Sequence, residues 1–131
     1  MIHPELHELD SDDIPNGEAE SFASIDPEYF GVMVAASIGV RGQEGGDWFY
    51  FLVRSPRFLA DEVAREGHVF ARNYLVLPRY NLTAIRRAIS ALCESIEGPD
   101  WETVARRIGR YGLWEFDEFY DSQRKRPANA Q

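Results

Sequence analysis

Two apolar runs on either side of a glycine-rich segment constrain the fold of this chain most strongly. Residues 29–40, YFGVMVAASIGV, and residues 47–53, DWFYFLV, are rich in β-branched and aromatic side chains, which favour strands. The segment between them, RGQEGG at residues 41–46, supplies the glycines that a tight turn requires. The two runs therefore predict a β-hairpin. Because both faces of the runs are apolar, we expect the hairpin to lie centrally in a sheet that helices cover on at least one side.

Three helices are predicted after the hairpin, each from its own start signal. Ser55 is a typical N-cap residue and Pro56 a typical first helical residue, so a helix is predicted to begin here and to end at Gly67. The apolar side of this helix is Phe58, Leu59 and Val63. The clearest amphipathic helix follows an Asn81 N-cap, since apolar residues recur at three- and four-residue steps: Leu82, Ile85, Ile89, Leu92 and Ile96. Asp100 caps a third helix that ends at Gly109 or Gly112, with inward-facing Trp101, Val104, Ala105 and Ile108.

The order of the elements indicates the fold class. Residues 2–9 alternate weakly, as in an edge strand, and residues 73–78 are typical of a short strand that ends at Pro78. Strands come first and helices later, which favours an α+β fold with an antiparallel or mixed sheet of about four strands packed against two to three helices. A chain of 131 residues is about one domain. We expect that domain to span residues 1–121 and to precede a disordered tail at 122–131.

The charge of the chain is acidic and unevenly distributed. The net charge is −8, and residues 1–30 contain nine acidic residues and no Lys or Arg. Such a surface repels nucleic-acid phosphates and anionic lipids, and it attracts basic partners over long range. The single cysteine, the N-terminal residues without a signal-peptide pattern and the lack of a long apolar run predict a cytoplasmic protein without disulfides. We therefore expect no nucleic-acid and no membrane partner.

The segment RYGLWEFDEFYD, residues 110–121, combines aromatic rings with carboxylates. If it is extended, Glu115 and Asp117 share one face about 7 Å apart, while Trp114 and Phe116 share the other. Two carboxylates at that separation could carry out acid/base hydrolysis of a glycoside, with Glu118 as a bystander. A half-buried strand produces the same alternation, with rings in the core and acids in water. We favour this structural interpretation.

Other candidate chemistry finds little support in the sequence. His3 and His7 have the spacing of a helical zinc site, but on a strand they would lie about 13 Å apart, too far to share one zinc ion. The turn RGQEGG lacks the context of a phosphate-binding loop. Cys93 lies beside the apolar side of the most regular helix, as expected for a buried small apolar residue. We predict no metal, no cofactor and no catalytic residue.

Several segments together resemble the immunity protein 8 family, whose members are encoded beside toxins of bacterial polymorphic toxin systems. They are DPEYFG at residues 26–31 with the strand that follows, SPRFL at 55–59, GHVFARNYLV at 67–76, the long helix, Trp101 with Glu102, and GLWEF at 112–116. The likeness covers most of residues 1–120 and omits the tail. It implies a small cytosolic α+β protein that binds and neutralises a cognate toxin.

Two main hypotheses and one simpler alternative follow. The first is a non-enzymatic antitoxin for a basic toxin such as a nuclease, whose candidate contact residues are acidic: Asp12, Asp13, Glu18, Glu20, Glu28, Glu44, Asp47, Glu115, Asp117 and Glu118. The second is an acid/base hydrolase that uses Glu115 and Asp117. The simpler alternative is a protein that forms a homodimer through exposed aromatic side chains.

Overall fold

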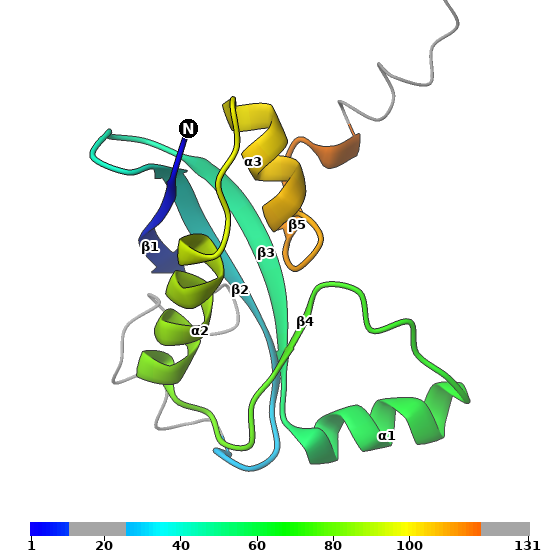
Figure 1. The fold of residues 1–131 in the computed structure, drawn as a ribbon. Helices are drawn as coiled ribbons and strands as arrows, with labels where there is room; N and C mark the ends of the chain where they lie inside the picture. Colours follow the sequence, from blue (N-terminus) through cyan, green and yellow to red (C-terminus); the bar gives the residue numbers. More distant parts are fainter. Residues whose placement is uncertain (11–25, 119–131) are drawn as a thin grey trace, which may run out of the picture.

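The hairpin predicted from the sequence forms the centre of the structure. The computed structural model describes residues 1–10 and 26–118 (Figure 1). Strand β2 (Gly31–Val40) pairs antiparallel with β3 (Asp47–Arg54), from Gly31 opposite Arg54 to Ile38 opposite Asp47. Most of the acidic N-terminal loop, with Asp12, Asp13, Glu18 and Glu20, and the tail at 122–131 lie outside the described residues.

The described residues form one mixed sheet of five strands, ordered β1-β2-β3-β4 with β5 also paired to β3. Strand β1 (Pro4–Asp10) is the antiparallel edge beside β2, as the sequence predicts. On the other side of β3, β4 (Tyr74–Val76) pairs in parallel and β5 (Leu113–Trp114) pairs antiparallel. The predicted α+β class is confirmed. The additional strand, β5, is only two residues long.

The three helices begin at the residues that the sequence indicates. They are α1 (Pro56–Glu66), α2 (Leu82–Glu94) and α3 (Trp101–Ile108). Their N-cap side chains each accept a hydrogen bond from the backbone N–H three residues on: Ser55 from Phe58 at 3.2 Å, Asn81 from Ala84 at 3.0 Å and Asp100 from Thr103 at 2.7 Å. Gly67 ends α1 in the left-handed conformation, with φ at 86°, where a side chain would add strain.

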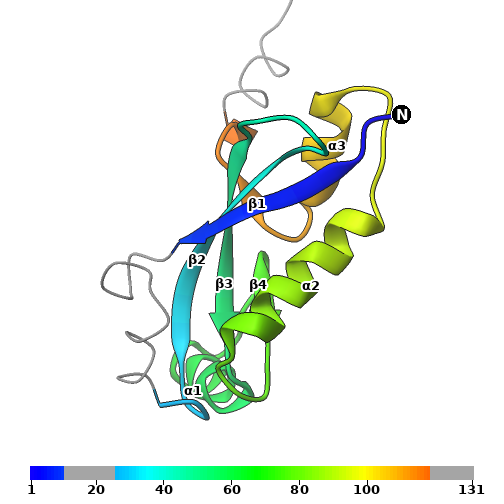
Figure 2. The same cartoon turned by 90° about the vertical axis from the view of Figure 1, so that its left-hand side faces the viewer.

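The core lies between one face of the sheet and two of the helices. Figure 2 shows α2 and α3 on the same side of the sheet. Helix α2 buries Ile85, Ile89 and Cys93, and α3 buries Val104, Ala105 and Ile108. These side chains pack against alternate residues of the hairpin, among them Val34, Ile38, Phe49, Phe51 and Val53. The opposite sheet face meets only the first turn of α1 among the described helices, where Phe58 packs against Gly31.

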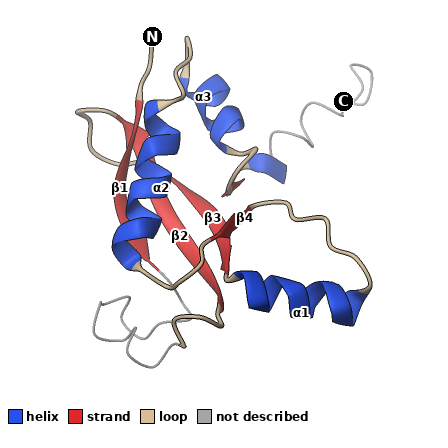
Figure 3. Cartoon of the chain, turned by 60° about the horizontal axis from the view of Figure 1, so that its bottom comes forward, coloured by secondary structure: helices blue, strands red, loops and turns tan. Residues whose placement is uncertain are grey.

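The apolar side of helix α1 that the sequence indicates is only partly buried. Figure 3 shows it projecting beside the sheet. Phe58 and Leu59 are half-buried, and Val63 is 41% exposed. The helix is held to the sheet by Arg54, whose Nε donates to Glu62 at 3.0 Å. The guanidinium of Arg54 also lies 5.1 Å from the ring centres of Phe58 and Tyr74. A half-buried ion pair with aromatic contacts thus anchors α1 in place of an apolar interface.

The aromatic segment near the C-terminus also departs in part from the prediction. Trp114 is buried, with 2% of its surface exposed, and its ring lies 6.5 Å from that of Phe49. Phe116, which we expected in the core, is 39% exposed. Strand β5 ends at Trp114, because the side chain of Glu115 replaces a backbone carbonyl as the acceptor for the Trp48 N–H. The chain then turns, so the strand alternation does not extend to residues 116 and 117.

Candidate functional site

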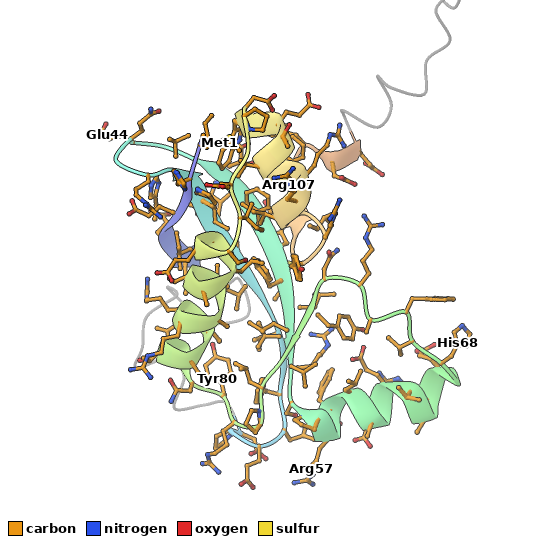
Figure 4. The ribbon with its side chains drawn as sticks, in the orientation of Figure 1. Met1, Glu44, Arg57, His68, Tyr80 and Arg107 are labelled. Carbon is orange, nitrogen blue, oxygen red and sulfur yellow. The ribbon has the colours of Figure 1, made fainter. Side chains whose placement is uncertain are left out.

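The structure divides the candidate acidic residues between two ends of the sheet. Glu28 precedes β2 and Glu44 follows it, so the ten residues of that strand, about 33 Å at its usual rise, separate them. Glu28 forms an ion pair with Arg79, with 2.7 Å between Oε1 and the guanidinium. Glu44 is exposed at the hairpin turn (Figure 4). The two residues therefore cannot contribute to one compact contact surface.

The remaining described candidates gather at the hairpin end of the sheet. Glu115, Asp117 and Glu118 line a pocket of about 410 Å3 together with Tyr50, Arg72, Leu113 and Trp114. This pocket, called the β5 pocket below, lies where β5 meets the first half of β3. Sequence reasoning identified its carboxylates but missed Tyr50, Arg72 and Leu113. Their placement depends on the pairing of distant segments, and the run DWFYFLV, which is apolar on both faces, does not indicate the orientation of Tyr50.

Asp47 has an internal role at this end of the sheet. Its Oδ2 accepts a hydrogen bond from Trp101 Nε1 at 2.7 Å and another from Trp114 Nε1 at 3.0 Å. The carboxylate thereby joins the start of β3 to both α3 and β5. Because one oxygen is already occupied by two indole donors, Asp47 supports the surface and contributes less to contact with a partner than Glu44 does.

Two carboxylates of the β5 pocket also have partners within the chain. Glu115 Oε2 accepts from the backbone N–H of Trp48, and the backbone N–H of Glu115 donates to the Trp48 carbonyl at 3.0 Å. Asp117 lies 3.8 Å from Arg72, whose side chain is 68% exposed. Glu115 therefore fixes the end of β5, whereas Asp117 forms only a long, solvent-accessible ion pair.

Aromatic and apolar side chains on the sheet face away from α2 and α3 border the β5 pocket. Tyr50 lies opposite both Ala35 and Leu113, so the three residues form one cross-strand row on the face away from α2 and α3. Trp48 lies on the same face, because it is two residues from Tyr50 along β3. Leu113 is 41% exposed, while Trp48 and Tyr50 are half-buried. Carboxylates thus stand beside an apolar surface.

The other sequence candidates for chemistry are separated or buried. His3 Nδ1 lies 3.6 Å from Glu97, and His7 Nε2 lies 3.5 Å from Glu5, so each histidine faces a different carboxylate. Within residues 1–10 and 26–118, no group of three or more His, Cys, Asp or Glu side chains could hold a metal ion. Burial of the Cys93 thiol in the core raises its pKa to about 11, and the nearby Glu94 and Glu5 add to the shift.

Comparison with known proteins gives one match. The protein-family model described as Immunity protein 8 matches residues 5–119, which confirms the resemblance seen in the sequence. Neither the curated proteins nor the solved structures contain a match to the chain. In the part of the chain that the structure describes, no helix is long and apolar enough to cross a membrane.

Proposed function

The chain belongs to the immunity protein 8 family, and from that premise we propose that it binds and neutralises a cognate bacterial toxin in the cytoplasm without catalysing a reaction. The observation that supports a basic toxin, such as a nuclease, is the charge distribution. The chain carries a net charge of −8, and its first 30 residues contain nine acids and no Lys or Arg. Such a field accelerates encounter with a basic protein and disfavours binding to nucleic acid.

The acidic residues act at two places in this proposal. Asp12, Asp13, Glu18 and Glu20 belong to the segment without basic residues and steer the toxin towards the chain. Glu44, Asp117 and Glu118 take part in the contact itself. Asp47 and Glu115 hold the surface together, since both carboxylates accept hydrogen bonds within the chain. Glu28 is assigned a lesser part, because Arg79 neutralises it.

Co-expression with the protein encoded by the neighbouring gene tests the proposal. The expected result is rescue of growth from the toxic activity and copurification of a stable complex. A matched control co-expresses the same toxin with an unrelated acidic protein of similar size, which should not rescue growth. If toxicity is unchanged and no complex copurifies, the proposed function is wrong.

Charge reversal tests the steering role of the N-terminal acids. Replacement of Asp12, Asp13, Glu18 and Glu20 by Lys should slow association at low salt, and the difference from the wild type should shrink as salt is added. The control reverses the same number of charges on the helices and nearby surface, at Glu66, Glu94, Glu97 and Glu102. An association rate equal to that of the control would exclude the N-terminal segment as the steering surface.

The β5 pocket is the observation that favours a hydrolase as the second candidate. It brings Glu115 and Asp117 to one concave surface, as acid/base chemistry would require. The hydrogen bond from Trp48 to Glu115 and the ion pair of Asp117 with Arg72 argue for structural roles instead. A variant with Glu115→Gln and Asp117→Asn should bind the toxin more weakly but still neutralise it when the variant is in excess. Loss of neutralisation with retained toxin binding would favour catalysis.

A further inference from the structure

We infer that the toxin docks on the sheet face away from α2 and α3 at the hairpin end, around Trp48, Tyr50 and Leu113, and inserts an arginine side chain into the β5 pocket. This inference rests on the proposed function and specifies the surface and the chemistry of the partner there. The residues Trp48, Tyr50 and Leu113 are called the hairpin-end surface below.

The first supporting observation is the two-layer arrangement of the described residues. Helices α2 and α3 cover one face of the sheet, and the first turn of α1 covers only the far end of the other, near Gly31. The row of Ala35, Tyr50 and Leu113 lies on the face away from α2 and α3. Aromatic side chains with large, rigid apolar surfaces are the residue types that dominate binding energy when they are buried in an interface.

The second observation is where large apolar side chains remain exposed. Leu113 is 41% exposed and Phe116 39%, and both belong to the short segment that contains β5. Tyr111, at 54%, instead lines a pocket with Ile89 and Leu92 of α2, and Phe70, at 87%, precedes β4. The ring centre of Phe116 lies 6.0 Å from that of the buried Trp114, and the two rings are nearly perpendicular, so the position of Phe116 is supported by the core. A preorganised aromatic group loses little conformational freedom when a partner covers it.

The third observation is the charge of the β5 pocket. Its lining contains three carboxylates and one guanidinium, that of Arg72. Arg72 lies 3.8 Å from Asp117, and its side chain is 68% exposed. The ion pair between Arg54 and Glu62 is shorter, at 3.0 Å, and neither of its side chains is more than 14% exposed. The Arg72 contact is therefore loose, and solvent screens it. A cation from the partner can therefore displace Arg72 from Asp117, or bind beside it, because breaking this exposed ion pair costs little free energy.

These observations together specify the group that the pocket accepts. An arginine guanidinium could donate to Asp117 and Glu118 while its flat face lies against the ring of Tyr50. Leu113, which lines the same pocket, would exclude water around that contact, which strengthens it. Glu44, exposed at the hairpin turn, adds negative charge to the same end of the sheet. The partner surface is thus apolar at its centre and basic around it.

The test uses paired substitutions in the full chain, measured by titration against the cognate toxin. Leu113→Asp should weaken binding by at least about thirtyfold, since it places a charge in the centre of the contact. Val63→Asp is the matched control, because Val63 on α1 is also 41% exposed and lies outside the hairpin-end surface. It should leave the dissociation constant within about threefold of the wild type, the range expected for a residue outside the interface.

A second pair tests the charge of the pocket independently of the apolar contact. Glu118→Arg should weaken binding and reduce its salt dependence, while Glu66→Arg on α1 changes the net charge equally and should have a much smaller effect. Thermal unfolding of each variant checks that the fold is intact. If Leu113→Asp is poorly folded, hydrogen exchange of the wild-type complex replaces it. Protection should then appear at residues 46–52 and 111–118 and not in α1.

The outcomes separate this inference from the proposed function. A wild-type chain that does not bind the toxin contradicts the proposed function. A wild-type chain that binds, with Leu113→Asp and Glu118→Arg binding equally well, leaves the function standing and overturns the inference. A wild-type dimer that Leu113→Asp dissociates would identify the hairpin-end surface as a contact between two copies of the chain, which also overturns it.

Discussion

Asp47 Oδ2 lies 3.0 Å from Trp114 Nε1, and this hydrogen bond joins residues that are 67 positions apart in the sequence. The same oxygen accepts from Trp101 at 2.7 Å, so one carboxylate connects β3, α3 and β5. Trp114 itself is buried, with 2% of its surface exposed. A side chain that the sequence indicated as a surface acid is therefore part of the framework behind the β5 pocket.

Substitution of Asp47 should reduce stability according to whether the acceptor oxygen is kept. Asp47→Ala removes the acceptor of two indole N–H groups, and we expect a loss of about 2 kcal/mol in the free energy of unfolding. Asp47→Asn retains an oxygen that can accept from both indoles, so its loss should be about 1 kcal/mol or less. Glu44→Ala, at the exposed hairpin turn, is the control and should change stability by less than about 0.5 kcal/mol. Urea denaturation followed by tryptophan fluorescence measures all three. Equal effects of the Ala and Asn variants would contradict the assigned role.

Substitution of Gly112 should disturb β5 through the core. A Cβ atom at this position would lie 2.4 Å from the ring of Phe51, closer than two carbons can approach. Gly112→Ala should therefore cost about 2 kcal/mol of unfolding free energy, within the range for overpacked sites. At Gly67 a Cβ would meet open space, and only the left-handed backbone opposes it, so Gly67→Ala should cost about 1 kcal/mol or less. Thermal denaturation distinguishes the two. A smaller loss at Gly112 than at Gly67 would show that β5 can move away from Phe51 freely.

The N-cap of α3 should make stability depend on pH in the acidic range. A hydrogen bond from the backbone N–H of Thr103, and then one from its side chain, lower the pKa of Asp100. Because the folded state holds this proton less tightly than the unfolded state, the stabilisation is complete above the ordinary aspartate pKa of about 4 and is lost as pH falls below it. Asp100→Asn keeps a good N-cap but removes the titration. The stability difference between wild type and Asp100→Asn should therefore shrink below about pH 4. If the stability difference between the wild type and Asp100→Asn stays constant as pH falls through the pKa of Asp100 in the folded state, titration of this N-cap does not affect stability.

The Cys93 thiol should be unreactive in the native protein. It is 2% exposed, and burial raises its pKa to about 11, so the thiolate is scarce at neutral pH. A thiol-specific chromogenic reagent should label the native chain slowly and react with one equivalent after denaturation. Because the folded state retains the proton more strongly than the unfolded state, Cys93 should also lower stability as pH rises above about 9. Cys93→Ala provides the control without this dependence. Rapid labelling in native buffer would show that the site opens readily.

The sequence by itself determined the local elements, since their signals lie within a few residues of each other. The Ser55, Asn81 and Asp100 caps are correct because an N-cap needs only a side-chain oxygen and a backbone N–H three residues on. The hairpin is correct because two apolar runs and a glycine-rich turn specify antiparallel pairing over a short loop. The likeness to the immunity protein 8 family depends on the order of short sequence segments, so it could also be detected from the sequence.

Only the tertiary structure decided which surfaces those elements share. Phe116 was assigned to the core from alternation alone, but β5 ends at Trp114 because Glu115 bonds to Trp48, a residue 67 positions away. Helix α1 has an apolar side, yet the described residues cover it only in part, and Arg54 holds the helix to the sheet. Asp47 and Glu44 are three residues apart and both carry a carboxylate, but only Asp47 meets two indole groups. Periodicity reports which side of an element is apolar, whereas the partner on that side depends on long-range pairing that no local pattern contains.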